Sequence, residues 1–358
     1  MNAATKPPKR ARPLRRESNA HLWFVTCRII EGRFWLHPIL TSAIEPPNHK
    51  ARRAAKAMMR HLDKRLGKRV ERANAQSGPN QPKLTLEDAR RMARGLIGSA
   101  LARAQKHCEV KVYALVVMSN HLHLIVQTTK KNLAAFMGYF KARITENLNL
   151  LTGKRGPLWA RRYDAVPITD DPSVAERMAY NVDNPCKANL VSTPEEWPGL
   201  NLAFGLGDSD ELEFEFLNRS KWHKARRPEQ LAPFFETVTL KLSPVPACEG
   251  MERELCRASL ESWLEHQRAK QHAKGNVRSG KPLGVEQVVH TPFEARPKEP
   301  SSGKRPYVFC EPERKAEQLA GQMVVSQAHF DCSKRFRGGD RSVQFPEGTY
   351  PPPLMQAA

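Results

Sequence analysis

Two histidines, one residue apart in an apolar run, are the side chains of this chain best placed to do chemistry. His121 and His123 flank Leu122 within the stretch VVMSNHLHLIV, residues 116–126. Successive side chains of a β-strand alternate between faces, so both imidazoles would share one face and the leucine would take the other. Two imidazoles on one face are most of a metal site and need one further ligand. The same pattern also fits two histidines on a solvated sheet face. The choice between these two interpretations depends on a second element of the chain.

That second element is a short helix near a proline. Asp171 is a good N-cap residue, and Pro172 suits the first helical position, where its missing N–H costs nothing. Pro185 disfavours helical geometry at Asn184, so the helix should end there. Tyr180 and Asn184 are four positions apart and would share one face. The amide oxygen of Asn184 would be a third ligand beside the histidines, with the Tyr180 hydroxyl one turn away.

These two elements resemble a known family. The triplet at 121–123, His-Leu-His, is similar to the HUH triplet of the single-tyrosine transposases. Residues 180–191, YNVDNPCKANLV, resemble the signature Tyr-x-x-x-Asn-Pro-x-x-(Ala/His)-Gly-x-Val of the REP-associated tyrosine transposases. Asn189 stands where that family usually has glycine, and asparagine tolerates a left-handed turn well. The resemblance therefore rests on both candidate elements, in the family's order.

Further segments follow the same order, and the likeness covers about residues 18–205. They resemble the family's first strand, its Trp-x-x-Arg-(Phe/Tyr) segment and its closing Trp-Pro, and they are residues 23–26 (WFVT), 158–163 (LWARRY) and 197–198. The segment 44–86 and the chain after about residue 206 have no counterpart in the short members of the family. These two parts are specific to this chain.

The resemblance implies a reaction and a fold. Single-tyrosine transposases cleave and rejoin single-stranded DNA at hairpins through a 5′-phosphotyrosine intermediate, which implies that Tyr180 is the nucleophile. It also implies a divalent cation, Mg²⁺ or Mn²⁺, held by His121, His123 and Asn184, because an octahedral hard cation leaves positions open for phosphate and water. The implied fold is a ferredoxin-like α+β sandwich with both histidines on a central strand. We expect a monomer or a homodimer.

Charge independently predicts a nucleic-acid partner. The chain has 58 Lys+Arg against 37 Asp+Glu. Residues 1–205 carry 35 basic and 16 acidic side chains, whereas residues 206–358 carry 23 and 21. The positive field thus lies on the part that bears the motifs, where a polyanion would bind. Anionic lipid is a weaker competitor, and excess charge can also serve solubility.

The composition also bears on the compartment. No run of eighteen or more apolar residues is present, and no apolar segment follows the N-terminal charges, so the sequence predicts neither a membrane span nor a secretory signal. The seven cysteines form no C-x-x-C pair, which indicates free thiols in a reducing compartment. We therefore expect a cytoplasmic protein.

Candidate DNA contacts lie in two places. Residues 50–72 hold ten basic and two acidic side chains, with apolar residues at helical spacing, so the insert 44–86 is interpreted as containing a basic amphipathic helix. A solvated helix face is the alternative. Arginine's planar fork suits phosphate oxygens, which adds the arginine pair before the tyrosine helix. The predicted DNA-binding residues are Arg161, Arg162, Lys187, Arg52, Arg53, Lys56 and Arg60.

The pattern of elements predicts an α+β sandwich with a central antiparallel sheet. The expected elements are strands at 21–30, 109–117, 121–127 and 164–168, and helices at 86–107, 132–151 and 249–271. The expected organisation is a disordered basic arm at 1–17, a transposase domain at 18–205, and a largely irregular extension at 206–358 that is disordered from 274. The sequence assigns no chemistry to that extension, and we expect the chain to fold without it.

Two other classes of function remain open at this stage. The first is a domesticated protein that binds a DNA or RNA hairpin without cutting it. The second is a metal-dependent hydrolase with water as the nucleophile, for which paired histidines would also serve. Only the transposase forms a covalent protein–DNA adduct, so that adduct separates the three.

Overall fold

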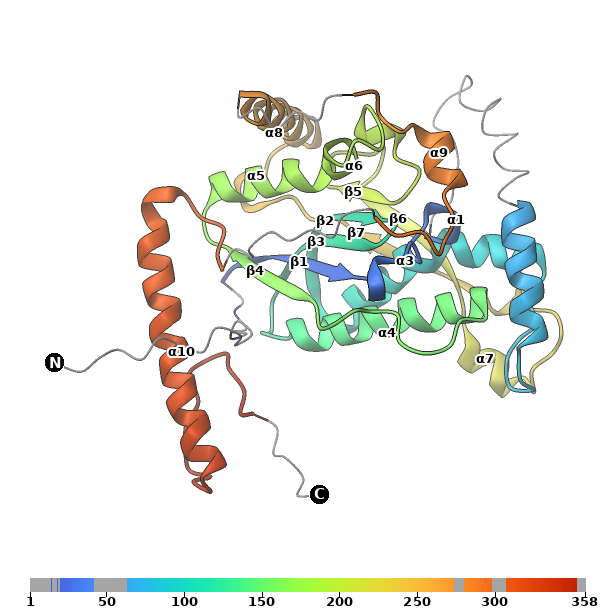
Figure 1. Ribbon diagram of the computed structural model, residues 1–358, viewed down its shortest axis with the longest axis horizontal. Helices are drawn as coiled ribbons and strands as arrows, with labels where there is room; N and C mark the ends of the chain where they lie inside the picture. The colour runs from blue at the N-terminus through green and yellow to red at the C-terminus, as the bar shows by residue number, and fades with distance from the viewer. Residues whose placement is uncertain are drawn as a thin grey trace.

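A five-stranded antiparallel sheet forms the centre of the molecule (Figure 1). The computed structural model describes residues 20–41, 63–273, 280–297 and 307–352, together with Leu14 and Ser18. The strand order is β4-β1-β3-β2-β5, and every neighbouring pair is antiparallel. The strands are β1 (Leu22–Arg28), β2 (Val110–Met118), β3 (His121–Thr128), β4 (Asp164–Ile168) and β5 (Asn201–Ala203). Both histidines therefore lie on the central strand, as predicted.

Two long helices cover one face of this sheet: α3 (Leu86–Cys108) and α4 (Leu133–Thr152). The helix α3 starts at a capping box, in which Thr85 and Asp88 bond each other's backbone N–H groups. The helix α4 ends at Gly153, whose φ of 66° is the left-handed conformation that glycine adopts without strain. The chain order β1-α3-β2-β3-α4-β4 is that of a ferredoxin-like sandwich, so the predicted fold is confirmed, with β5 as an added edge strand.

The opposite face carries α5 (Asp171–Val182), and α8 (Arg253–Ala273) packs on α5. Side chains of β1 alternate between the two layers, because Trp23 and Val25 join the core under α3 and α4, whereas Phe24 packs with the residues of α5. On β3, Leu122 joins the core under α3 and α4, and His123 contacts the ring of Phe24. The predicted alternation of the histidine strand is therefore confirmed.

The structure corrects two details of the tyrosine helix. Its N-cap is Asp170, whose side chain accepts a hydrogen bond from the backbone N–H of Ser173 at 2.9 Å, so Asp171 is already helical. The helix ends at Val182, and Asn184 begins a separate single turn, α6 (Asn184–Lys187). Proline fits the first turn of a new helix, which explains why α6 starts beside Pro185. Tyr180 and Asn184 thus lie on two helices rather than on one face of the same helix.

The region after residue 206 contains more regular structure than the sequence predicted. The prediction of irregular structure misses a two-stranded sheet of β6 (Glu211–Leu217) and β7 (Phe235–Lys241), and the helices α7 (Arg219–Lys224), α9 (Val285–His290) and α10 (Lys315–Arg337). Near the N-terminus lie α1 (Pro38–Thr41) and a helix at 63–75. Short 3₁₀ turns are η1 (Ile30–Gly32), η2 (Pro194–Glu196), η3 (Ala232–Phe234), η4 (Pro246–Cys248) and η5 (Pro312–Arg314).

The hairpin β6–β7 packs directly on α3 because two glycines let it approach. A Cβ added at Gly95 would lie 1.7 Å from the backbone oxygen of Glu215, and one at Gly98 would lie 2.3 Å from the ring of Phe214. Only a residue without a side chain fits at such distances. The elements after residue 206 therefore contribute to the same core as the sheet, through the buried residues Leu217, Trp222, Leu231, Leu240, Leu242, Val289 and Phe293.

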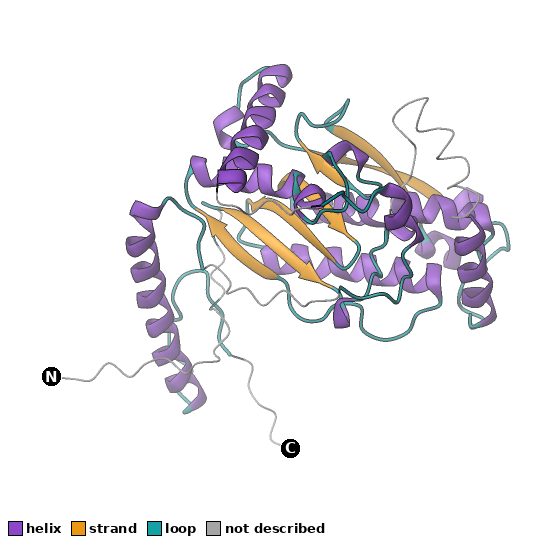
Figure 2. Ribbon diagram, turned by 45° about the horizontal axis from the view of Figure 1, so that its top comes forward, coloured by secondary structure: helices purple, strands orange, loops and turns teal. Residues whose placement is uncertain are grey.

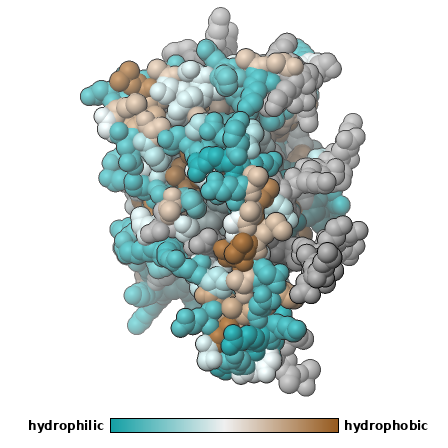
Figure 3. All heavy atoms as spheres, turned by 90° about the vertical axis from the view of Figure 1, so that its left-hand side faces the viewer, coloured by the Kyte–Doolittle hydropathy of each residue, from teal (hydrophilic) through white to brown (hydrophobic). Residues whose placement is uncertain are grey.

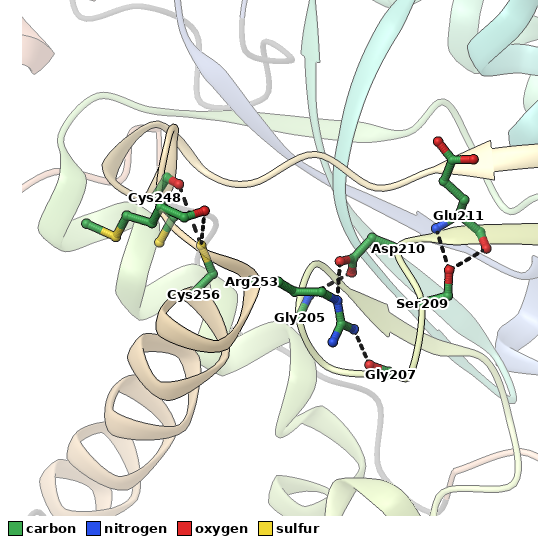
Figure 4. Close-up of polar contacts among 9 residues, drawn as sticks. Gly205, Gly207, Ser209, Asp210, Glu211, Cys248, Arg253 and Cys256 are labelled. Atoms are coloured by element: carbon green, nitrogen blue, oxygen red, sulfur yellow. Dashed lines mark hydrogen bonds and ion pairs between the residues drawn. The ribbon is translucent and has the colours of Figure 1, made fainter.

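The connection between β5 and β6, where the sequence predicted the domain boundary, is fastened to α8 (Figure 4). The carboxylate of Asp210 accepts from the backbone N–H of Gly205 at 2.8 Å and pairs with Arg253 at 2.6 Å. Arg253 also donates to the backbone oxygen of Gly207. These contacts tie the two sides of the expected boundary together.

A chain shortened to end near Gly207 is accordingly expected to be insoluble or unfolded. The shortened chain would lack the seven core residues named above, so the part of the core that they cover would be exposed to solvent. Burying one large apolar side chain contributes about 1.5–3 kcal/mol. The summed loss, on the order of 10 kcal/mol, is as large as the whole stability of a typical domain. Circular dichroism and urea unfolding of the shortened and full chains test this. A soluble, cooperatively unfolding product would support the boundary that the sequence predicted.

The helix α10 lies to one side of the molecule (Figures 1 and 2). The backbone of Phe309, shortly before it, pairs with Pro167 and Thr169 beside β4, and Glu347 after it forms an ion pair with Lys131. Figure 3 shows this side of the molecule as a mixed surface, on which apolar side chains are separated by hydrophilic ones. The helix thus extends the fold without belonging to its core.

A buried histidine joins α1 to α9. His37 is fully buried, its Nδ1 accepts from the backbone N–H of Ile39 at 3.2 Å, and its Nε2 donates to the backbone oxygen of Val288 at 3.0 Å. This pattern uses the neutral imidazole, which has one donor and one acceptor. Burial, with a further contribution from the charge of Arg65, lowers the pKa of His37 to about 3.

Because the unfolded chain binds a proton at His37 below pH 6.5 and the folded chain does not, this histidine contributes stability above pH 6.5 that is lost as the pH falls toward about 3. We expect the contribution to shrink by about 2 kcal/mol between neutral pH and about pH 5. The variant His37→Gln keeps an N–H for Val288 but does not titrate, so its unfolding free energy should fall less over that interval. Urea unfolding at the two pH values measures the difference, and equal slopes in both proteins would contradict it.

Some predicted features lie outside the described residues. These are Arg52, Arg53, Lys56 and Arg60 of the insert and, except for Leu14, the basic arm at 1–17. The described part of the insert is helical at 63–75, as predicted. All seven cysteines are free thiols, which was also predicted. Within the described ranges, no helix is both long and apolar enough to cross a membrane.

Candidate active site

The two histidines lie side by side on the α5 face of the sheet. Their ring centroids are 4.9 Å apart and the rings are nearly perpendicular. In the antiparallel register His121 is opposite Arg28 of β1, and His123 is opposite Thr26. His123 is buried, whereas His121 is partly exposed. Of the two imidazoles, that of His121 is therefore the more accessible to solvent.

Each histidine uses Nδ1 for a hydrogen bond. Nδ1 of His121 is 2.6 Å from Oδ1 of Asn120, and Nδ1 of His123 is 2.9 Å from Oγ1 of Thr26. An amide oxygen only accepts, so the proton of His121 is on Nδ1 and the lone pair is on Nε2. Histidines that bind metals commonly donate their other ring N–H in this way, which fixes the tautomer and the ring orientation.

Both imidazoles are neutral at neutral pH. Desolvation by the surrounding protein, with a smaller contribution from the charge of Arg28, lowers the pKa of His121 to about 3. Burial is also the largest cause for His123, whose pKa is well below its usual value, and His121, Arg28 and Arg177 add to the effect. Neutral imidazoles need to lose no proton before binding a cation.

The ring of Tyr180 lies next to this pair. Its centroid is 5.9 Å from that of His123 and 5.9 Å from that of Phe24, both in edge-on contact. Two cations lie over the tyrosine ring: Nζ of Lys187 is 4.4 Å from the centroid, and the guanidinium carbon of Arg177 is 5.0 Å from it. The structure therefore brings Tyr180, Lys187 and the histidines together, although they come from three different elements.

Arg177 is a site residue that the sequence analysis missed. It is paired with Glu176 at 2.7 Å, only 13% of its side chain is exposed, and its Nε–H has no acceptor among the described residues. The signal was its spacing, since it precedes Tyr180 by three positions and shares its helix face. Partial burial, followed by the positive charge of Arg177, lowers the pKa of Lys187, the other cation over the ring.

The C-terminal region reaches this site through Phe309. Its ring lies 5.6 Å from that of Phe24, and Arg177 stacks over it at 4.5 Å. The backbone N–H of Phe309 donates to the oxygen of Pro167 at 2.9 Å, which places this segment beside β4. Phe309 thus closes one side of the aromatic group around Tyr180, and nothing in its local sequence pattern predicted this.

Asn184 is buried at the start of α6, one turn beyond Tyr180. The ring contacts of His123 reach Tyr180, and the described contacts do not join Asn184 to the histidines. Within the described residues, no group of three His, Cys, Asp or Glu side chains could hold a metal ion. An asparagine amide is not among these residue types, so the set of His121, His123 and Asn184 stays a prediction.

Arg161 and Arg162 lie at the same end of the sheet as His121. Both are exposed, and the backbone N–H of Ala160 donates to the oxygen of Arg28, the residue opposite His121. Arg161 is also 3.5 Å from Asp164, whose pKa is raised by burial in spite of the neighbouring cations. The arginine pair is therefore placed where it could contact a strand that enters the site.

Asn189, the departure from the family signature, has a φ of 56°. This is the left-handed conformation that the signature glycine would adopt, so asparagine replaces it as expected. The turn it forms is fixed by two hydrogen bonds, from the N–H of Asn189 to Cys186 and from the N–H of Leu190 to Pro185.

Comparison with known proteins supports the resemblance read from the motifs. Residues 89–180 match the model of the family described as "Transposase IS200 like". This segment begins within α3 and ends within α5, and it contains His121, His123 and Tyr180, whereas Asn184 and Lys187 lie just beyond it. The resemblance to a transposase family is thus confirmed for the segment that carries His121, His123 and Tyr180.

The other comparisons are more distant. No curated protein matches the chain. A solved structure described as "Structure of the REP associates tyrosine transposase bound to a REP hairpin" is similar at 13% sequence identity, with a TM-score of 0.30. The match covers 54% of this chain and 81% of that one.

Proposed function

We propose that this protein cleaves and rejoins single-stranded DNA, at hairpins, through a covalent bond between Tyr180 and the 5′-phosphate. The observation that carries the proposal is the position of Tyr180, whose ring contacts His123 and has the cations of both Lys187 and Arg177 over it. A tyrosine in the core has no need of two positive charges over its ring. A tyrosine that attacks a phosphodiester does, because the phosphate is negative and repels nucleophiles.

The histidine pair fits a divalent cation in one specific respect. Asn120 and Thr26 engage the two Nδ1 atoms, and Nε2 of His121 is left as a ligand atom. Mg²⁺ or Mn²⁺ would be held by His121, His123 and Asn184. When bound, such an ion supplies positive charge that neutralises the scissile phosphate and holds it in line for attack.

The protein's own residues account for the rest of the step. The Tyr180 oxygen forms a bond to phosphorus while the bond from phosphorus to the 3′ oxygen breaks, and the phenolic proton balances the leaving oxygen as a 3′-hydroxyl. Arg177 and Lys187 would bind the phosphate oxygens during this exchange. The bond between Tyr180 and the phosphate retains the free energy of the broken phosphodiester bond. A second 3′-hydroxyl can therefore attack this phosphate and rejoin the DNA without ATP.

The test is the covalent adduct. The protein is incubated with Mn²⁺ and a library of imperfect DNA hairpins flanked by single strands and labelled at the 3′ end. Since the part of the strand on the 3′ side of the cut stays on the tyrosine, label should migrate with the protein on a denaturing gel. Sequencing of the adducts identifies the hairpins used. Cleaved DNA without any adduct would indicate a hydrolase, and hairpin binding without cleavage would indicate the domesticated protein.

A further inference from the structure

A cavity of about 410 Å³ lies away from Tyr180, between the basic helix (residues 63–75) and the segment that follows α9. Its lining includes the side chains of Arg65, Lys68, Arg69 and Arg72 on one side and of His290 and Glu294 on the other. One carboxylate thus faces four permanent cations. A hollow with this balance is suited to an anion.

Two of these four cationic side chains, those of Arg65 and Arg69, join the two walls of the cavity. Arg65 donates to the backbone oxygens of Val289 at 2.6 Å and Thr291 at 2.9 Å. Arg69 is paired with Glu294, the one carboxylate of the lining, and stacks over the ring of Phe293 at 5.1 Å. These contacts fix the basic helix to the segment after α9, so the cavity is a built part of the fold rather than a gap between loose parts.

The other two cations are available for a ligand. Lys68 and Arg72 are both exposed, one turn apart on the same side of the basic helix. Across the described part of the chain, neither is paired with a carboxylate. The cavity therefore presents two positive charges without a paired carboxylate, on a frame that the contacts of Arg65 and Arg69 hold together.

The cavity lies at the same end of the sheet as the histidines. The backbone N–H of Ile29 donates to Asn120, and that of Leu36 donates to Ser119, both in the turn just before His121. Trp35, which lies between Ile29 and Leu36 in the sequence, also supports the cavity, because Arg69 stacks over its ring at 5.3 Å. One short segment therefore connects the histidine site and the cavity.

We propose that this cavity binds the phosphodiester backbone of a single-stranded segment of the DNA substrate, through Lys68 and Arg72. The hollow has a volume of about 410 Å³ and is open to solvent, so one nucleotide of a flexible single strand fits into it, whereas the wider stem of a hairpin could reach only its rim. The inference rests on the proposed function for its choice of ligand. It assigns a role to the insert that short family members lack.

The experiment measures binding of labelled oligothymidylate, which forms no hairpin, to the full chain. In the double variant Lys68→Gln/Arg72→Gln, the plot of log affinity against log salt should be shallower by about 1.4, since each phosphate contact on a single strand contributes about 0.7. At about 0.1 M salt this corresponds to roughly 25-fold weaker binding. The matched control is Lys334→Gln/Arg337→Gln on the exposed face of α10, which removes the same charge and should change neither quantity.

A second arm uses a blunt DNA hairpin without single-stranded flanks, whose binding the cavity variant should not weaken. Equal loss in both double variants would mean that only net charge matters, and would overturn the proposal. So would weakened binding of the blunt hairpin, or loss of inorganic phosphate binding with oligothymidylate binding unchanged. Adduct formation at Tyr180 is measured separately, so failure of the cavity and failure of the proposed reaction give different results.

Discussion

Tyr180→Phe is expected to abolish DNA cleavage and adduct formation while leaving the fold and DNA binding intact. The substitution removes only the hydroxyl, and the ring contacts with Phe24 and His123 are made by the part of the side chain that remains. Removing the nucleophile of an enzyme that works through a covalent intermediate lowers the rate by a factor on the order of 10⁴ to 10⁶. The stacking of Lys187 on the ring would also persist, so binding of the DNA should change little.

The measurement is cleavage of 3′-labelled hairpin DNA, followed by the adduct on a denaturing gel. Tyr139→Phe is the matched control, because Tyr139 is a partly buried tyrosine of α4 that stacks on His107 and has no contact with the site histidines among the described residues. It should cleave at the wild-type rate. Cleavage by the Tyr180 variant at that rate would show that another residue is the nucleophile.

The sheet and the histidine face could be predicted because they depend on short-range rules. Alternation along β3 alone determines that His121 and His123 share a face, and the turn before them makes β2 and β3 antiparallel. The predicted N-cap of α5 was wrong by one residue. Asp170 and Asp171 are both acceptable caps, and only the extended backbone conformation of Asp170 distinguishes them. Local rules therefore gave the elements but not their limits.

The C-terminal region was harder because its signals are distributed. In β6, the residues Leu212, Phe214 and Phe216 alternate with glutamates, which is a strand pattern, but the acidic side chains resemble a solvated turn. What makes β6 part of the core is its contact with Gly95 and Gly98 of α3, far away in sequence. Contacts of this kind, like that of Phe309 with Phe24, depend on tertiary structure that periodicity does not contain.

The same limit applies to the candidate site. The motifs identified Tyr180, the histidines and Lys187, whereas Arg177 and Asn120 were missed. Both lie close in sequence to residues that the motifs identified, but their role depends on the orientation of their side chains. Arg177 must point toward Tyr180, and the amide oxygen of Asn120 must point toward His121. Sequence spacing restricts such directions, and the fold determines them.

Substitution of the histidine pair should remove both metal binding and cleavage. His121→Ala and His123→Ala each delete one of the two imidazoles that we propose as metal ligands, and we expect both variants to lose cleavage, as the wild type should in excess EDTA. Asn184→Ala should reduce cleavage less, because water can replace an amide oxygen. Mn²⁺ binding, followed by electron paramagnetic resonance, provides a readout that does not depend on the reaction. His107→Ala, an exposed histidine on α3, is the control and should bind Mn²⁺ normally.

Asn120 allows a finer test of the same proposed site, because it contacts His121 and would act on a metal only through that histidine. Asn120→Ala removes the acceptor at 2.6 Å from Nδ1, which frees the imidazole to rotate and to change tautomer. Loss of such a partner typically weakens metal binding by about 10–100-fold. Asn120→Asp keeps an acceptor and should restore most of the Mn²⁺ affinity. If the alanine variant binds Mn²⁺ like the wild type, Asn120 does not orient a metal ligand. If the wild type binds no Mn²⁺ and cleaves DNA fully in EDTA, the histidine pair does not hold a metal.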